Sequence, residues 1–265
     1  MSQTRLQIPD HVKPYLEAEY CDDFPIERYY VSSLQSEILQ DVLKAQKVNK
    51  RMQELGLYYL NATLLYGVPG TGKTTFGRYM SYYFDMDYVY INFAKLYNGV
   101  LGSTAGRISD IFRYISDTEA IFMLDEIDAI SQKRGTESEV TGGEIGRITI
   151  TIMQELDIMK RKKVDAIILG CTNRIDIMDP ALKDRFSIKK EVKALNNREK
   201  VEYITQFLDH TGIPYDAKNI EDYAYSNTTL SNRSIDADIN RGAVRWVENG
   251  EKGCLYLEHI RENVS

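Results

Sequence analysis

The chain has 265 residues, of which 43% are hydrophobic and 27% are charged. This balance is typical of a soluble globular protein, large enough for one main domain and a small second one. It excludes a disordered, collagen-like or disulfide-scaffold chain. The formal net charge of −6 disfavours a broad basic surface for nucleic acid or anionic membranes.

The cysteines are Cys21, Cys171 and Cys254, which lie far apart and form no CxxC pair. This spacing indicates free thiols in a reducing compartment, and the scattered histidines indicate no zinc site. Residues 1–10 lack the apolar core of a signal peptide, and no segment reaches the roughly 18 apolar residues of a membrane span. We therefore expect a cytoplasmic protein without a membrane span.

The first 24 residues contain two prolines and an acidic pair, which predict an irregular lead-in over residues 1–24. Apolar residues at helical spacing then predict a helix over 33–55. Beyond it, short apolar runs alternate with helical patterns, which predicts a parallel sheet with helices on both faces. The expected strands are 62–66, 88–92, 120–124, 164–170 and 187–192, and the expected helices are 73–84, 103–116 and 143–157.

After Leu195 the pattern is helical throughout. Asn196 is a suitable cap for the first of these helices. The expected helices are 197–210, 216–225, 231–248 and 255–262. The sequence therefore predicts an α/β domain over residues 25–194, followed by a small all-helical domain over residues 195–265.

Residues Gly67–Thr74 match the pattern GxxxxGK[ST] between a predicted buried strand and a predicted helix. Glycines let the backbone curl so that successive N–H groups face phosphate oxygens. Lys73 supplies a positive charge for the β- and γ-phosphates, and the Thr74 hydroxyl ligates Mg²⁺. The predicted nucleotide-binding residues are Gly67, Val68, Pro69, Gly70, Thr71, Gly72, Lys73, Thr74 and Thr75.

An acidic pair, Asp125 and Glu126, directly follows the apolar run Ile121–Leu124. Ligands of parallel sheets bind at the carboxyl ends of the strands, where these side chains emerge. Asp125 is therefore predicted to hold the Mg²⁺ shell together with Thr74, and Glu126 to orient and polarise the attacking water.

These motifs resemble those of the AAA+ ATPase family, and more narrowly of its AAA branch. Gly67–Thr74 resembles the Walker A motif, and Leu124–Ile130, with the letters LDEIDAI, resembles Walker B. The stretches that resemble the second region of homology are 171–174, 179–182 and 185–186. The likeness covers about residues 27–262, and it implies an ATP-hydrolysing core with ATP between the α/β domain and a helical lid.

The resemblance implies roles for three further residues. Asn173 is similar to sensor 1, whose amide bonds the γ-phosphate or the attacking water. Arg233 is similar to sensor 2, an arginine on the lid. Arg185 resembles the arginine finger that one subunit offers to its neighbour's nucleotide, with Arg174 as a second candidate. The segment around Arg185 is two residues shorter than in the AAA branch, with Lys183 in place of the first arginine.

Two segments occupy the positions of pore loops in the family. Residues 96–103 either contact a polypeptide substrate or form a structural strand-to-helix turn. Residues 131–143 are either a second pore loop or a surface loop. The basic run 160–163 either meets an acidic partner or nucleic acid, or is a solvated loop.

The function expected from the resemblance is ATP hydrolysis, with ATP and Mg²⁺, in a homo-oligomer. Because Arg185 would act on a neighbour's nucleotide, we expect a ring or helical oligomer, with a hexamer foremost. A protein client or adaptor is the expected partner, and the ATPase would remodel or translocate that client. Two alternatives are a DNA-associated motor or loader, and a nucleotide-gated scaffold with slow turnover.

Overall fold

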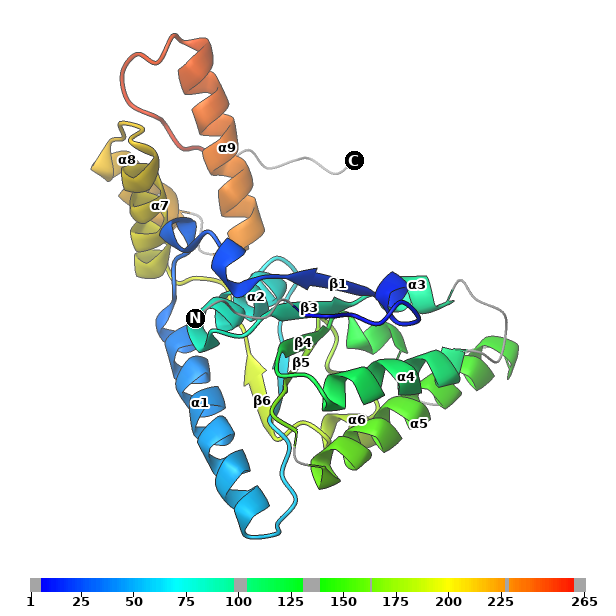
Figure 1. The fold of residues 1–265 in the computed structure, drawn as a ribbon. Helices are drawn as coiled ribbons and strands as arrows, with labels where there is room; N and C mark the ends of the chain where they lie inside the picture. The colour runs from blue at the N-terminus through cyan, green and yellow to red at the C-terminus, as the bar shows by residue number, and fades with distance from the viewer. Residues whose placement is uncertain (1–5, 98–103, 131–138, 163, 227–228, 260–265) are drawn as a thin grey trace. The chain divides into compact units, whose positions relative to one another are not determined.

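The computed structural model describes residues 6–97, 104–130, 139–162, 164–226 and 229–259 of the chain (Figure 1). The chain divides into two compact units. The first unit holds the described parts of Met1–Phe24, Glu37–Gly67 and Lys73–Glu191, and the second holds those of Pro25–Ser36, Val68–Gly72 and Val192–Ser265.

A six-stranded sheet forms the centre of the first unit. Its strands are β1 (Leu16–Glu19), β2 (Ala62–Tyr66), β3 (Tyr88–Ile91), β4 (Ile121–Leu124), β5 (Ile167–Thr172) and β6 (Ile188–Glu191). They lie in the order β1-β3-β4-β5-β2-β6, and every pair is parallel except the antiparallel pair of β1 and β3. The predicted parallel sheet is confirmed, and β5 begins three residues later than expected.

The helices of the first unit connect these strands. They are α2 (Lys73–Phe84), α3 (Phe93–Tyr97), α4 (Thr104–Ser116), α5 (Glu139–Arg161) and α6 (Pro180–Lys183). Helix α1 (Ser33–Glu54) begins among residues grouped with the second unit and continues in the first. Among the described residues, no helix combines the length and the apolar composition that crossing a bilayer requires.

Helices cover both faces of the sheet, so its strands carry apolar side chains on both sides. In β4, Phe122 belongs to a core cluster with Ile111 of α4 and Ile152 of α5. The next residue, Met123, faces α2 instead, because a Cβ atom at Gly77 would lie 2.2 Å from Met123 Cε. The prediction of helices on both faces is confirmed, and the missing side chain of Gly77 lets α2 approach the sheet closely.

The sheet has one strand that the sequence analysis did not predict. Strand β1 lies within residues 1–24, for which the sequence predicts an irregular lead-in. Only Leu16 is buried in this strand, so the segment has too little apolar alternation to be recognised. Arg78 Nε donates a hydrogen bond of 2.6 Å to Glu19 Oε2, at the end of the strand. The four residues of β1 pair with β3 in an antiparallel ladder. Tertiary pairing therefore makes this strand, rather than its local pattern.

The second unit is helical. Its helices are α7 (Asn197–Thr211), α8 (Ala217–Ser226) and α9 (Asn232–Glu248), with a common core that includes Ile204, Ile220 and Ile239. Asn196 caps α7 as predicted, because its side chain accepts a hydrogen bond from the Glu199 N–H group, and the Glu199 carboxylate accepts one from the Asn196 N–H group. This capping box satisfies backbone donors that the first turn leaves open.

The predicted helix over 255–262 is wrong in the part that the structure describes, and its last three residues lie outside that part. The segment is extended: Leu255 and Leu257 are buried, and Tyr256 between them is exposed. This is the two-residue alternation of a strand. The Asn219 side chain accepts from the Leu257 N–H group at 2.8 Å and donates to its carbonyl oxygen at 3.2 Å. The Leu255 N–H group also donates to the carbonyl oxygen of Pro214 at 2.7 Å, so backbone pairing and a side chain of α8 together hold the segment extended.

Candidate active site

The phosphate loop leaves β2 and curls before α2 begins at Lys73. Gly70 and Gly72 have φ angles of 80° and 84°, in the left-handed region where a side chain is strained. Lys73 Nζ donates a hydrogen bond of 2.9 Å to the carbonyl oxygen of Gly67, and only 7% of Lys73 is exposed. The loop therefore has the backbone curvature that the motif predicts, with a buried positive charge at its end.

The other residues of the loop differ in exposure, and Thr71 is fully buried. Val68 and Pro69 are exposed, and Val68 accepts a hydrogen bond of 3.1 Å from the Thr71 hydroxyl. Thr75 is exposed on the first turn of α2. Nucleotide contact by these residues stays a prediction.

The two residues expected to ligate Mg²⁺ lie side by side. Thr74 Oγ1, on the first turn of α2, donates a hydrogen bond of 2.7 Å to Asp125 Oδ2, just after β4. A hydroxyl and a carboxylate are the hard oxygen ligands that Mg²⁺ prefers, and it needs only one or two of them beside the phosphate oxygens. The donor set in this structure therefore fits Mg²⁺.

Glu126 adopts an unusual backbone conformation. Its φ angle is 50°, which is uncommon for a residue with a side chain, and its N–H group donates to Asp125 Oδ1 at 2.9 Å. Such strain costs on the order of 1 kcal/mol and is concentrated at functional sites. The turn ends β4 abruptly and leaves the Glu126 side chain exposed, while Ile127 and the residues after it form a short 3-10 helix.

A hydrogen-bonded link joins this helix to the end of β5. Thr172 Oγ1 donates to Asp128 Oδ1 at 2.7 Å and accepts from the Arg174 N–H group at 2.9 Å. Asn173, between the two bonded residues, is half-buried. The link therefore fixes the backbone on both sides of the predicted sensor residue. The sequence analysis gave Asp128 and Thr172 no such role, although both lie inside its motifs.

The charges of this site act on Cys171, which is buried in β5. Burial raises the pKa of this thiol, and the negative charge of Asp125 raises it further, whereas Lys73 opposes the effect. Cys171 therefore stays a neutral thiol and is not a nucleophile.

In the second unit, the first turn of α9 meets the apex of the phosphate loop. The Arg233 N–H group donates to the carbonyl oxygen of Gly70 at 3.1 Å, and Asn232 Nδ2 donates to that of Thr71 at 3.1 Å. Arg233 itself is exposed. The structure thus brings the backbone of the predicted sensor 2 residue to the loop. It also identifies Asn232, which the sequence analysis missed because no motif marks it.

The predicted arginine finger is held by its own chain. Arg185 Nη2 donates to Asp157 Oδ2 at 3.0 Å, and Nη1 donates to the carbonyl oxygen of Ala181 at 3.0 Å. A cavity of about 260 Å³ lies beside Arg185, with Tyr58 and Lys160 also in its wall. The contact of Asp157 with Arg185 was not predicted, because nothing in the sequence pairs residues 28 positions apart.

Arg185 lies near the amino ends of the strands, whereas the phosphate loop of its own chain follows the carboxyl end of β2. Ser187 Oγ, two residues on, donates to the carbonyl oxygens of Leu60 and Ala62, both at 3.0 Å, at the amino end of β2. The loop begins at Gly67, beyond the carboxyl end of the same strand. At about 3.3 Å per residue, β2 separates the two places by about 16 Å.

The predicted pore loops and the basic run lie only partly within the described residues. Most of 96–103 and 131–143 lies outside the described residues. Residues 139–143, predicted as part of a loop, are the start of α5, so the loop prediction is wrong there. The last residue of the basic run 160–163 also lies outside the described residues, and its other residues are exposed. Arg174, the second candidate for a finger, is exposed and pairs with Asp176 at 3.1 Å.

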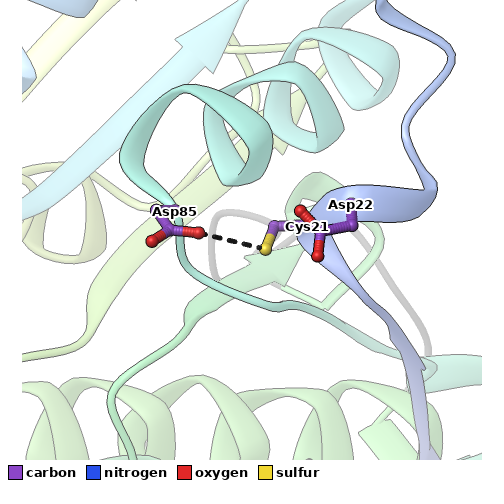
Figure 2. A group of neighbouring side chains, drawn as sticks. All are labelled: Cys21, Asp22 and Asp85. Carbon is purple, nitrogen blue, oxygen red and sulfur yellow. Dashed lines mark hydrogen bonds between the residues drawn. The ribbon is translucent and has the colours of Figure 1, made fainter. Parts of the chain in front are cut away.

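One cluster of potential metal ligands lies away from this site. The ligand atoms of Cys21, Asp22 and Asp85 lie within 4.8 Å of one another (Figure 2). The Cys21 thiol donates to Asp85 Oδ1 at 3.6 Å, and its backbone N–H group donates to Asp87 Oδ1 at 3.2 Å. Burial, and then the charges of Asp22 and Asp87, raise the pKa of the thiol. These contacts tie the segment after β1 to the turn between α2 and β3, so we assign the cluster a structural role.

Comparison with known protein families supports a nucleotide-binding site in the first unit. Residues 63–194, about half of the chain, match the sequence profile of the ATPase family associated with various cellular activities (AAA). The match begins in β2 and ends just after β6, so it includes the phosphate loop, the acidic pair and Asn173.

Individual relatives share about a third of the aligned residues. The "probable inactive ATP-dependent zinc metalloprotease FTSHI 4, chloroplastic" of Arabidopsis thaliana is 33% identical over 62% of this chain and 19% of that protein. The 26S proteasome regulatory subunit 8 of Dictyostelium discoideum is 29% identical over 71% and 48%. The proteasome-activating nucleotidase of Methanococcus maripaludis is 31% identical over 80% and 52%. The chain spans about half the length, or less, of these relatives.

Proposed function

The chain belongs to the AAA+ ATPase family, and on this premise we propose that it hydrolyses ATP in a ring-shaped oligomer and thereby remodels or translocates a protein client. The observation that carries the proposal is the hydrogen bond of 2.7 Å between Thr74 and Asp125, directly beside the phosphate loop. A buried lysine, a hydroxyl and a carboxylate converge there, as binding of a magnesium nucleotide requires.

The residues of the first unit have separate tasks in this reaction. The backbone N–H groups of the phosphate loop and the Lys73 ammonium bind the phosphates. Thr74 and Asp125 hold Mg²⁺, which when bound offsets the negative charge of the phosphate oxygens. The exposed carboxylate of Glu126 accepts a hydrogen bond from the attacking water and orients it. Asn173 bonds the γ-phosphate or that water.

A second subunit completes the site. Ser187, two residues after Arg185, bonds the start of β2, and the phosphate loop begins at the other end of this strand, about 16 Å away. We infer that Arg185 does not serve the nucleotide of its own chain. We propose that it offers its guanidinium to the γ-phosphate bound by a neighbour, where it offsets the charge that develops during hydrolysis. A repeated head-to-tail contact of this kind generates a ring when its rotation closes and an open helix when it does not, and we propose a closed hexamer.

We further propose that the second unit acts as the lid, with Arg233 contributing to phosphate binding. The names of the relatives include a proteasome regulatory subunit, a proteasome-activating nucleotidase and a probable inactive metalloprotease, and they support a protein client or adaptor. The net charge of −6 disfavours nucleic acid. The cytoplasm is the proposed location.

A substrate trap tests the proposed function. Glu126→Gln protein loaded with ATP is recovered from its native extract, and the bound molecules are identified. We expect a protein that is retained with ATP and released with ADP. The control is the double variant Lys73→Ala, Glu126→Gln, which cannot load ATP and should retain nothing. Nucleic acid that disappears on nuclease treatment would overturn the protein-client proposal in favour of a DNA-associated motor.

A further inference from the structure

The apex of the phosphate loop is held from outside by two donors of the same helix. The carbonyl oxygen of Gly70 accepts from the Arg233 N–H group, and that of Thr71 accepts from Asn232 Nδ2, both at 3.1 Å. The first is a backbone bond that any residue supplies. The second depends on the side chain of Asn232 and is lost on substitution.

The direction of these two carbonyl groups also sets the direction of the N–H groups that would bind phosphate. In a trans peptide unit, the C=O group of one residue and the N–H group of the next point in opposite directions. The carbonyl groups of Gly70 and Thr71 point to α9, so the N–H groups of Thr71 and Gly72 point away from it. Two successive N–H groups on one side of a glycine-rich turn are a nest for phosphate oxygens.

Asn232 is itself held in place, because Asn232 Oδ1 accepts a hydrogen bond of 3.4 Å from the Leu195 N–H group in the connection before α7. The fit around the loop is close. A Cβ atom at Gly70 would lie 2.9 Å from Ser231 Oγ, and one at Gly72 would lie 3.8 Å from Asn232 Nδ2. The amide of Asn232 thus links the loop to two other segments of the second unit.

We propose that Asn232 is a positioning residue that sets the nucleotide affinity, because it holds the Thr71–Gly72 peptide in the orientation that aims its N–H group at the phosphates. The inference rests on the proposed function and deepens it. The nest binds the α- and β-phosphates, which ATP and ADP share. Asn232 therefore acts equally on both nucleotides, unlike Glu126 and Arg185, which act on the γ-phosphate.

Calorimetric titration with Mg·ADP, and with Mg·ATP in a Glu126→Gln background, tests the inference. A neutral hydrogen bond of this kind is worth a factor of about 3 to 10, so Asn232→Ala should raise both dissociation constants by about that factor. At saturating ATP, the kcat of the Asn232→Ala protein should change by less than about twofold.

The variant Asn232→Asp keeps the acceptor for the Leu195 N–H group but loses the donor to the Thr71 carbonyl oxygen. It should weaken nucleotide binding at least as much as Asn232→Ala. An exposed residue of the same helix supplies the matched control, Asn240→Ala, which should change nothing.

A second variant separates positioning from general loosening of the helix. Ser231 is the N-cap of α9, and its Oγ accepts from the Ser234 N–H group at 3.2 Å. Ser231→Ala weakens the helix start but leaves the Asn232 amide, so its effect on affinity should be the smaller one. An equal effect, unchanged affinities for Asn232→Ala, or a change for ATP alone would each overturn the inference. If the unaltered chain binds no nucleotide, the proposed function itself fails.

Discussion

The two ends of strand β2 carry different kinds of machinery. At its carboxyl end, the phosphate loop, Lys73 and Thr74 meet Asp125 within hydrogen-bond distance. At its amino end, Arg185 donates a hydrogen bond to Asp157 and lines a cavity of about 260 Å³. We propose that the groups at the carboxyl end bind and activate a nucleotide. We propose that the Arg185 cation at the amino end serves the nucleotide of a neighbouring chain.

This difference indicates which parts of the reaction one chain performs alone. Binding of ATP should need only groups of one chain, whereas hydrolysis should also need Arg185 at the amino end of the sheet of a second chain. Substitutions at the two ends should therefore separate nucleotide affinity from turnover.

The largest effect is expected at the carboxyl end. Lys73→Ala removes the buried ammonium, and ATP binding should fall below detection in calorimetry because the phosphate charge is no longer offset. Lys44→Ala, at an exposed position on α1, is the control and should bind ATP normally. Retained affinity in Lys73→Ala would contradict the role of the phosphate loop.

Glu126→Gln should separate binding from hydrolysis. A positioned general base contributes up to about 10⁴-fold, so kcat should fall by that order while the ATP dissociation constant stays unchanged. Glu119→Gln is the matched control, because Glu119 is exposed at the amino end of the same strand. If Glu126→Gln turns over ATP normally in a phosphate-release assay, another group orients the water.

Arg185→Ala tests the amino end. An arginine finger is worth about 10³-fold or more in other nucleotide hydrolases, so kcat should fall by about 10³ with ATP affinity retained. Arg174→Ala is the comparison variant and should have little effect, because we assign the finger to Arg185; both arginines are paired with a carboxylate of their own chain. A larger loss for Arg174→Ala than for Arg185→Ala would reverse the assignment of the finger.

The smallest effect is expected from Asp157→Asn. In the proposed ring, Asp157 would compete with a neighbour's phosphate for Arg185, and a half-exposed ion pair is worth up to about 1 kcal/mol. Turnover of the assembled protein should therefore rise by a few fold. Asp184→Asn, in the wall of the same cavity but paired with Lys189, should leave it unchanged. A fall in turnover for Asp157→Asn would mean that the pair holds Arg185 in its productive position.

Local sequence patterns predict the carboxyl end of the sheet well. The strands that end there are apolar runs, and the candidate site residues lie in short contiguous motifs. The strand 62–66 and the helix 73–84 were therefore predicted to the residue. The contact of Thr74 with Asp125 follows from the same motifs, because both residues end or begin elements that meet at one sheet edge.

The features that the sequence did not predict depend on tertiary contacts. Strand β1 has one buried residue, and pairing with β3 makes it a strand. The segment after Gly253 contains apolar residues that fit either a helix or a strand, and tertiary contacts, among them those of Asn219, decide for the extended form. Asp157 and Asn232 act through partners 28 and 161 positions away, which no local pattern encodes.

Mixing two inactive variants tests the central claim, that one chain's carboxyl edge works with another chain's Arg185, most directly. Arg185→Ala subunits keep an intact nucleotide site, and Glu126→Gln subunits keep an intact finger. We predict that each alone is inactive and that mixtures recover hydrolysis, with a maximum at intermediate ratios. Absence of recovery at every ratio, with mixed assembly verified by tagged subunits, would contradict a site shared between chains.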